Sequence, residues 1–268
     1  MKVDDQPKKR PPKRTLEQAE HRAELGRLKA QFGRADQDLH KANRALRMLS
    51  ECSQVLVRAE DEIGLLNSIC RIIVGTGGYR MCWVGYAERD ENSTVRPVAQ
   101  RGYEDGYLDL INITWADTER GRGPTGMAIR TGKVCTVRNI LTDPDFAIWR
   151  DQAVERGYSS AAALPLLAEG RAFGSLNVYA AQADAFDTRE LGLLTQLADD
   201  LAYGIEALRA RARRIEAEAA LRESEKNFRM LALEANEGIL VASDRTAKHV
   251  FANRRAAEIT GYSIDELL

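Results

Sequence analysis

Two stretches of the chain place apolar residues at alternating spacings of three and four positions, over residues 25–49 and 191–219. This heptad pattern is typical of the seam along which two helices pack in a coiled coil. We therefore predict one long helix before a central region, another after it, and a homodimer formed through both. The predicted seam residues are Leu25, Leu28, Phe32, Leu39, Leu46, Leu49, Leu194, Leu201, Ile205, Leu208 and Ile215.

The region between the two helices mixes strand and helix patterns. Residues 61–74 repeat apolar side chains at helical spacing and end in a glycine-rich turn, which predicts a helix. Because strands and helices do not alternate strictly, the pattern indicates an α+β fold with an antiparallel sheet of about six strands flanked by helices. The predicted strands are 79–87, 94–100, 111–115, 133–137, 160–167 and 173–180, the last two forming a hairpin.

Composition and charge narrow the partners. The chain has 268 residues, 44% of them apolar, and a net charge of −1, so nothing global points to a nucleic acid. It contains no apolar run of the roughly 18 residues that a membrane span needs. Residues 1–14 are rich in Lys, Arg and Pro but lack the apolar segment of a secretion signal. We therefore predict a disordered basic tail and a cytoplasmic protein.

Short motifs follow one another in a fixed order between residues 130 and 187: RTGKVC at 130–135, TDPDF at 142–146, GSL at 174–176 and FD at 186–187. With this order and spacing, residues 47–208 resemble the GAF domain family. The resemblance implies a twisted antiparallel sheet with helices on both sides and a ligand pocket between the sheet and the short helices. It also implies a sensory module of a bacterial signal-transduction protein, attached to an output domain such as a histidine kinase, a diguanylate cyclase or a phosphodiesterase.

The C-terminal residues resemble the first part of a PAS domain. The resemblance rests on Phe228, GI at 238–239, Asn253 and GYS at 261–263, while Ala247 and His249 depart from the usual pattern. The predicted organisation is a tail over 1–14, a coiled-coil helix over 15–46, a GAF-like domain over 47–208, a signalling helix over 187–222 that overlaps its end, and a truncated PAS-like domain over 223–268.

The candidate ligand site rests on aromatic and basic residues. Aromatic side chains that carry a polar group often line binding sites, and a GAF-like fold would bring four of them round one cavity. Two arginines lie in a glycine-rich loop before a helix N-terminus, where free N–H groups can hold an anion, although the loop lacks the Lys-Ser/Thr ending of a P-loop. The predicted ligand-binding residues are Trp83, Tyr86, Trp115, Trp149, Arg120 and Arg122.

Several cofactor and metal classes do not fit. Residues 47–208 contain no histidine, which excludes a haem held by a histidine of this domain. A bilin site typically has histidine after its cysteine, but Thr136 follows Cys135. The signature of cyclic-nucleotide GAF domains is matched only at Asn177, Phe186 and Glu190. The four cysteines have neither zinc-ligand nor disulfide-framework spacing. We predict no cofactor and no metal.

The predicted function is a non-catalytic input module that binds a small molecule and signals to a downstream output domain through a dimeric helix. One alternative is a thiol-dependent enzyme of the GAF-type methionine sulfoxide reductase class, with Cys135 as its reactive thiol. Another is a dimerisation spacer without a working pocket.

Overall fold

The computed structural model describes residues 13–103, 106–243 and 248–268. It divides into two compact units, one ending at Glu206 and the other running from Ala207 to Leu268. Residues 1–12 of the predicted basic tail lie outside the described residues, and Lys13 and Arg14 belong to a helix.

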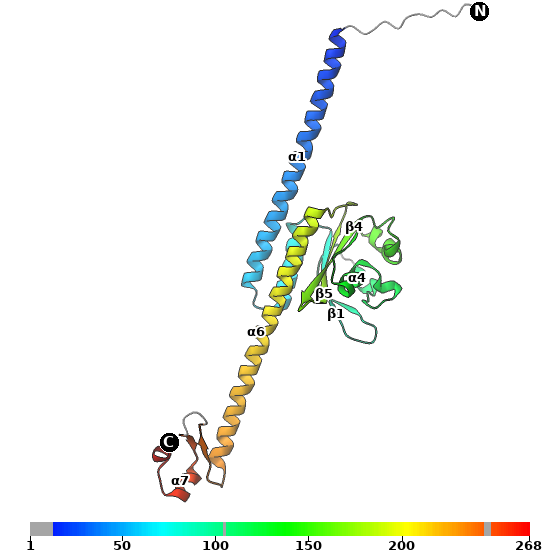
Figure 1. Ribbon diagram of the computed structural model, residues 1–268. Helices are drawn as coiled ribbons and strands as arrows, with labels where there is room; N and C mark the ends of the chain where they lie inside the picture. The colour runs from blue at the N-terminus through cyan, green and yellow to red at the C-terminus, as the bar shows by residue number, and fades with distance from the viewer. Residues whose placement is uncertain (1–12, 104–105, 244–247) are drawn as a thin grey trace, which may run out of the picture. The chain divides into compact units, whose positions relative to one another are not determined.

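The centre of the first unit is an antiparallel sheet of five strands in the order β2-β1-β5-β4-β3 (Figure 1). The strands are β1 (Met81–Ala87), β2 (Val95–Gly102), β3 (Cys135–Val137), β4 (Ser160–Ala168) and β5 (Arg171–Ala180). The β4–β5 hairpin forms as predicted, and its turn places Glu169 and Gly170 at φ values of 50° and 75°. These are the backbone angles that a two-residue hairpin turn favours.

The predicted strand at 111–115 does not form, so the described sheet has five strands rather than about six. Residues Tyr107–Ile111 form the short helix α3 instead, and Asn112 follows with a left-handed φ of 38°. That turn breaks the extended backbone, and a single bridge between Thr94 and Thr114 is the pairing that remains.

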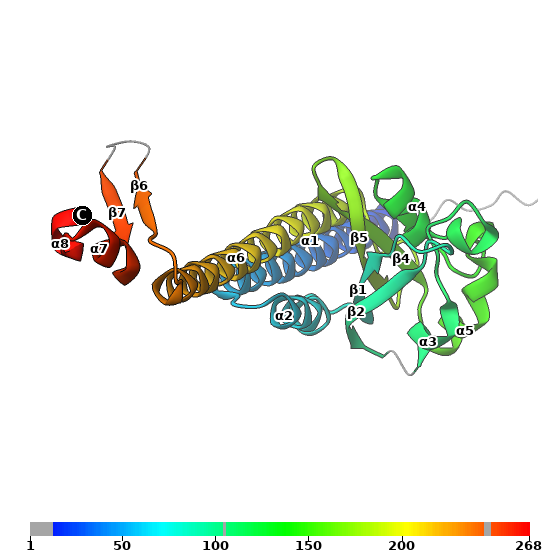
Figure 2. The same ribbon diagram turned by 90° about the horizontal axis from the view of Figure 1, so that it is seen from below.

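Two layers of helices cover the two faces of this sheet (Figure 2). One face carries α1 (Lys13–Arg58), α2 (Glu62–Gly75) and the first part of α6 (Thr188–Glu234). The other face carries the short helices α3, η1 (Glu119–Gly121), α4 (Pro124–Thr131), η2 (Pro144–Trp149) and α5 (Arg150–Glu155). Between this second layer and the sheet lies a core of buried aromatic side chains, where the GAF resemblance places a ligand pocket.

The first part of α6 lies beside α1, and the two helices run in the same direction (Figure 1). Arg44 of α1 forms an ion pair with Glu190 of α6 at 3.5 Å. Farther along, Gly204 of α6 lies against the side chains of Leu56 of α1 and Leu65 of α2. An added Cβ at Gly204 would come within 2.7 Å of Leu56, so the glycine sets how closely the helices approach.

The predicted dimer seam on α6 is wrong at Leu194, Leu201 and Ile205. All three side chains are fully buried within their own protomer, so a partner chain cannot reach them. A heptad pattern and the apolar face of a helix that packs on its own domain look alike over a few turns. Leu208 is half-buried and Ile215 is exposed.

The predicted seam on α1 differs, because several of its residues face solvent. Leu28, Leu39 and Leu46 are exposed, and Leu49 is half-buried. The side chains of Leu25 and Phe32 lie outside what the structure describes.

The second unit contains the rest of α6 and a small α/β segment. Its elements are β6 (Leu240–Ala242), β7 (His249–Ala252), α7 (Arg254–Thr260) and α8 (Ile264–Leu267), with β6 and β7 antiparallel. Buried Asn253 holds this segment together: its Oδ1 accepts from the N–H groups of Ile239 and Ala256, and its Nδ2 donates to the carbonyls of Ala232 and Glu237. None of the helices described in either unit is long and apolar enough to cross a bilayer.

Candidate functional site

The space between the sheet and the short helices is filled by aromatic side chains. Tyr107 meets Tyr158 and Tyr179 edge-on, with ring centroids 5.4 and 5.9 Å apart. The rings of Phe146 and Trp149 lie 5.6 Å apart. Such tilted and edge-on pairs add to the stabilisation that comes from burying the rings. The full set is Trp83, Tyr107, Phe146, Trp149, Tyr158 and Tyr179, with aliphatic residues around it.

Trp83 on β1 is the exceptional member of this aromatic core. Its side chain is fully buried, and its Nε1–H makes no hydrogen bond of good geometry to a described residue, although it lies near enough to the Tyr179 hydroxyl to interact with it. A buried donor without a partner costs about 1–3 kcal/mol relative to one that is satisfied. Buried indole N–H groups usually find a partner, so this one marks a place where a further acceptor would be stabilising.

Two tyrosine hydroxyls lie near this unpaired donor. Burial is the main cause that raises the pKa values of Tyr107 and Tyr179, and the interaction with Tyr107 and Trp83 partly opposes the rise for Tyr179. Both hydroxyls therefore stay protonated at neutral pH and keep a proton to donate. The tyrosine hydroxyls of the core are thus neutral hydrogen-bonding groups, and the buried guanidinium of Arg156 lies 5.5 Å from the centroid of the Tyr107 ring.

Two cavities adjoin the aromatic core. The larger, of about 560 Å³, lies between β2 and α3, with Trp83, Val95, Leu108 and Ile111 among its walls and Asn92, Thr94, Asp109 and Asn112 among its polar rim. The smaller, of about 10 Å³, lies between Tyr107, Tyr179, Thr125 and Trp149. The smaller one holds at most about one water molecule. The larger one has the volume of a small-molecule site.

The four predicted aromatic site residues do not surround one cavity. Trp83 and Trp149 both belong to the core, where Trp149 Nε1 donates to the carbonyl of Ile111 at 3.0 Å. Tyr86 lies on the opposite face of the sheet and donates to Glu62 of α2 at 2.5 Å, since residues three apart on a strand point to opposite faces. Trp115 is half-buried and lines a separate cavity at the β4–β5 turn.

The predicted arginines Arg120 and Arg122 are committed to their own loop. Arg120 Nη1 donates to the carbonyl of Ile111 at 3.1 Å, and Arg122 pairs with exposed Asp117 at 3.3 Å. The glycines of this loop serve close packing. An added Cβ at Gly121 would come within 1.8 Å of the Ala116 carbonyl. The loop therefore supports α4, and nothing in its contacts favours the anion site.

The residues that match the cyclic-nucleotide signature also serve packing. Asn177 of β5 accepts a hydrogen bond from Thr125 of α4 at 2.8 Å, so it fastens α4 to the sheet. Glu190 accepts from the hydroxyl of Tyr79, and the ring of Phe186 stacks on Tyr79 at 5.8 Å. Each of the three positions is therefore occupied within the fold.

The cysteines lie on both sides of the sheet. Cys52 of α1, Cys70 of α2 and Cys82 of β1 are all buried, and the Cys82 thiol contacts Cys70 Sγ at 3.7 Å. Burial is the largest cause that raises the pKa of Cys52 to about 12 and the pKa of Cys82 well above its usual value. Half-buried Cys135 lies on β3, three strand spacings from β1, or about 14 Å. That separation is too great for a disulfide with Cys82 without large movement.

The pKa of Cys135 is also raised, mainly by burial, with Arg130 opposing the rise. We therefore expect Cys135 to be the one thiol that reacts with 5,5′-dithiobis(2-nitrobenzoic acid) in the native chain. The reaction should be slow and should accelerate with pH, because only the thiolate attacks. The other three thiols should appear only in urea, and Cys135→Ser should abolish the native-state reaction. A second fast thiol would show that the buried cluster opens readily.

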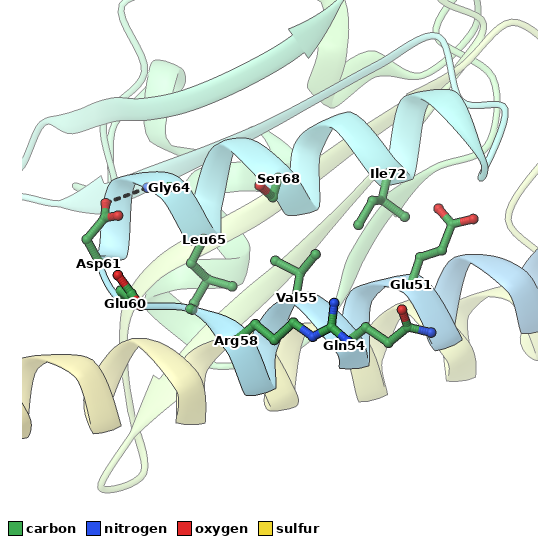
Figure 3. Close-up of a pocket in the computed structure, with 11 residues that line it drawn as sticks. Glu51, Gln54, Val55, Arg58, Glu60, Asp61, Gly64, Leu65, Ser68 and Ile72 are labelled. Carbon is green, nitrogen blue, oxygen red and sulfur yellow. Dashed lines mark hydrogen bonds between the residues drawn. The ribbon is translucent and has the colours of Figure 1, made fainter.

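A fourth cavity, of about 550 Å³, lies on the opposite side of the sheet between α1 and α2 (Figure 3). Val55, Leu65 and Ile72 point into the gap between the helices. The carboxylates are partly committed: Asp61 accepts from the N–H of Gly64 at 2.7 Å, and Glu51 accepts from the Thr76 hydroxyl at 2.6 Å. This groove is therefore a packing seam between two helices, in which Asp61 caps the N-terminus of α2 and Glu51 ties α1 to Thr76 at the other end of α2.

Comparison with known proteins identifies the fold. The family model described as GAF domain matches residues 59–206, more than half of the chain. The chain belongs to the GAF domain family. A search of curated proteins finds no match.

Among solved structures, the chain is similar to the free methionine-R-sulfoxide reductase of Neisseria meningitidis, with 20% identity, a TM-score of 0.52, and coverage of 62% of this chain and 91% of that one. It is also similar to the GAF domain of a phosphoenolpyruvate-protein phosphotransferase from Coxiella burnetii, with 17% identity, a TM-score of 0.53, and coverage of 64% and 98%. A third is the GAF domain of the Acinetobacter phosphoenolpyruvate-protein phosphotransferase, with 15% identity, a TM-score of 0.50, and coverage of 63% and 97%. At these identities the likeness shows the GAF fold and not an activity.

Sequence reasoning missed the tyrosines of this GAF core. Tyr179 follows Asn177 by two positions on β5, so the strand period alone places both on one face. Tyr107 and Tyr158 carried no such local signal, because both lie outside the strands and reach the core through tertiary packing.

Proposed function

We propose that this GAF domain is a non-catalytic input module of a bacterial signalling protein that binds a small molecule in the aromatic core. The observation that carries the proposal is the buried Nε1–H of Trp83, which makes no hydrogen bond of good geometry to a described residue, on a side chain that lines a cavity of about 560 Å³. A ligand with an apolar body and one hydrogen-bond acceptor matches these surroundings, because the tyrosine hydroxyls near Trp83 are neutral and the walls are largely apolar, with Asp109 on the rim.

Native mass spectrometry and thermal-shift screening of the full chain against neutral metabolites test this proposal. We expect a ligand that raises the melting temperature of the wild type. Trp83→Phe should weaken its binding about tenfold, because a hydrogen bond to a buried donor is worth on the order of 1 kcal/mol or more.

Trp115→Phe is the matched control, since Trp115 lines a different cavity and its Nε1 already donates to the carbonyl of Glu88 at 2.9 Å. Equal losses for the two variants would mean that the ligand does not contact Trp83. A screen without any stabilising compound would favour the spacer alternative.

The thiol-dependent alternative has less support. Reduction of a sulfoxide by a cysteine leaves an oxidised sulfur that a second thiol usually resolves. The Cys135 thiol has no second cysteine near it among the described residues, and its pKa is raised rather than lowered. The free state of all four cysteines accords with the reducing cytoplasm as the proposed location.

We also propose a homodimer through α1. Leu28, Leu39, Leu46 and Val57 are 45%, 58%, 61% and 87% exposed. Their spacings of 11, 7 and 11 residues return each side chain to one line along the helix. The N-terminal half of α1 extends past the sheet (Figure 1). A single helix without tertiary partners is marginal in water, which favours a second copy of α1 as its partner.

The proposed output route is α6, which begins soon after β5 and continues as one helix from Thr188 to Glu234. A PAS-like segment over residues 223–268, followed by an output domain in the complete protein, remains part of this proposal. The capping of α7 by Asn253 and of α8 by Ser263 supports a specifically folded segment there.

A further inference from the structure

A cavity of about 730 Å³ lies where the β4–β5 turn, the turn after β1 and the C-terminal end of α4 meet. It is separate from the two cavities beside the aromatic core and shares no lining residue with either. Its walls are apolar side chains, among them Trp115, Ile129 and Phe173. Three arginines and one glutamate also line it, Arg89, Arg130, Arg171 and Glu169, so its formal charge is three minus one, or +2.

Hydrogen bonds to backbone carbonyls hold two of the residues that line this cavity, Trp115 and Arg130, in place. Trp115 Nε1 donates to the carbonyl of Glu88 at 2.9 Å, which fixes the turn from which Arg89 projects. Arg130 Nη1 donates to the carbonyls of Trp115, Ala116 and Gly121 at 3.0–3.1 Å. The guanidinium of Arg130 is half-buried and forms a long ion pair with exposed Asp117 at 3.9 Å, which offsets part of its charge. Arg130 is therefore a fixed positive charge in the wall.

The guanidinium groups of Arg89 and Arg171, unlike that of Arg130, are available to bind a ligand. Neither side chain makes a hydrogen bond or ion pair with any residue that the structure describes. Arg171 begins β5 directly after the turn residues Glu169 and Gly170, and Arg89 follows the end of β1. Two free guanidinium groups on separate turns thus converge on one apolar cavity. A guanidinium prefers a carboxylate or phosphate partner, which it can bind through two N–H groups at once.

We propose that this cavity binds a small planar organic anion. Its ring lies against Trp115 and Phe173, and its anionic group is held by Arg89 and Arg171, with Arg130 adding positive potential from the wall. Aromatic faces favour a planar ring, and the net positive lining disfavours a cation. The site would stand even if the core cavity bound nothing, because the two share none of the residues that carry the argument.

Titration calorimetry of the full chain with 2-naphthoate, and with neutral 2-naphthamide as its isostere, tests the site. We expect saturable naphthoate binding that weakens as ionic strength rises, and naphthamide binding at least about tenfold weaker. The double variant Arg89→Gln/Arg171→Gln should bind naphthoate about tenfold more weakly. Both side chains are exposed, so circular dichroism should show an unchanged fold.

The matched control is Arg101→Gln/Arg189→Gln, which removes the same charge from exposed positions away from this cavity. Arg101 lies opposite Cys82 in the β1–β2 ladder, at the other end of β1 from Ala87. This control and Trp83→Phe should both bind naphthoate like the wild type. The proposal would be overturned if naphthoate and naphthamide bound equally well, or if no saturable binding were seen. It would also be overturned if both arginine double variants lost the same naphthoate affinity, or if only Trp83→Phe lost it.

Discussion

Leu46→Glu should convert the proposed dimer to a monomer without unfolding the GAF domain, whereas Leu201→Glu should prevent the domain from folding. Leu46 is 61% exposed on α1, so a charge there meets water in the monomer and a second charge across a dimer axis. Leu201 is fully buried on α6, and burying an unpaired carboxylate costs several kcal/mol. Light scattering should show that Leu46→Glu has half the mass of the wild type. Its urea unfolding midpoint should equal that of the wild type when both are extrapolated to low protein concentration.

A control variant separates the effect of position from that of charge. Gln54→Glu adds the same charge on the side of α1 that faces α2, where Gln54 lies along the groove (Figure 3). It should remain a dimer. The proposed interface would be wrong if Leu46→Glu kept the mass of a dimer. A folded, monomeric Leu201→Glu would instead restore α6 as the dimer seam.

This contrast shows what a heptad pattern can and cannot predict. The spacing of three and four residues correctly indicated long helices on both sides of the central domain. It could not say which apolar face meets the protomer's own core, because both uses need the same residues at the same spacing. On α6 the core takes Leu194 and Leu201, and on α1 it takes Ala45 and Met48, leaving Leu46 outside.

Elements with strong local signals were predictable from the sequence. The hairpin over β4 and β5 follows from a short turn between two apolar runs, and α2 begins directly after Asp61, whose side chain caps it. The strand expected at 111–115 failed because a left-handed residue, Asn112, interrupts an otherwise strand-like run. Nothing local distinguishes such a residue from one in extended conformation, since asparagine tolerates both.

The candidate site was predictable in residue type but not in arrangement. Trp83 and Trp149 do meet in one core, as their size and polar N–H groups suggested. Trp115 went elsewhere because its indole reaches the turn after β1, a contact across 27 residues that no pattern in the sequence encodes. The anion site could not be predicted either, because Arg89 and Arg171 are far apart in the sequence and only the fold brings them to one cavity.

Gly126→Ala should strongly destabilise the GAF domain although it lies in a helix. Alanine normally stabilises a helix by about 1 kcal/mol relative to glycine. At Gly126, however, an added Cβ would lie 2.4 Å from the Gly121 carbonyl oxygen and 2.6 Å from that of Thr114. Both neighbours are backbone atoms, which cannot rotate away as a side chain does. Overpacking of this kind costs about 1–3 kcal/mol and should show as a lower urea midpoint.

Gly192→Ala is the matched control, because Gly192 lies in α6 and an added Cβ there meets nothing within 4 Å. It should raise stability by about 0.5–1 kcal/mol, the intrinsic helix preference of alanine. Opposite signs for the same substitution would establish that α4 rests directly on the backbone beneath it. If Gly126→Ala were as stabilising as Gly192→Ala, α4 would sit higher over the sheet. The Thr125–Asn177 hydrogen bond, which requires close seating, would then not form in solution.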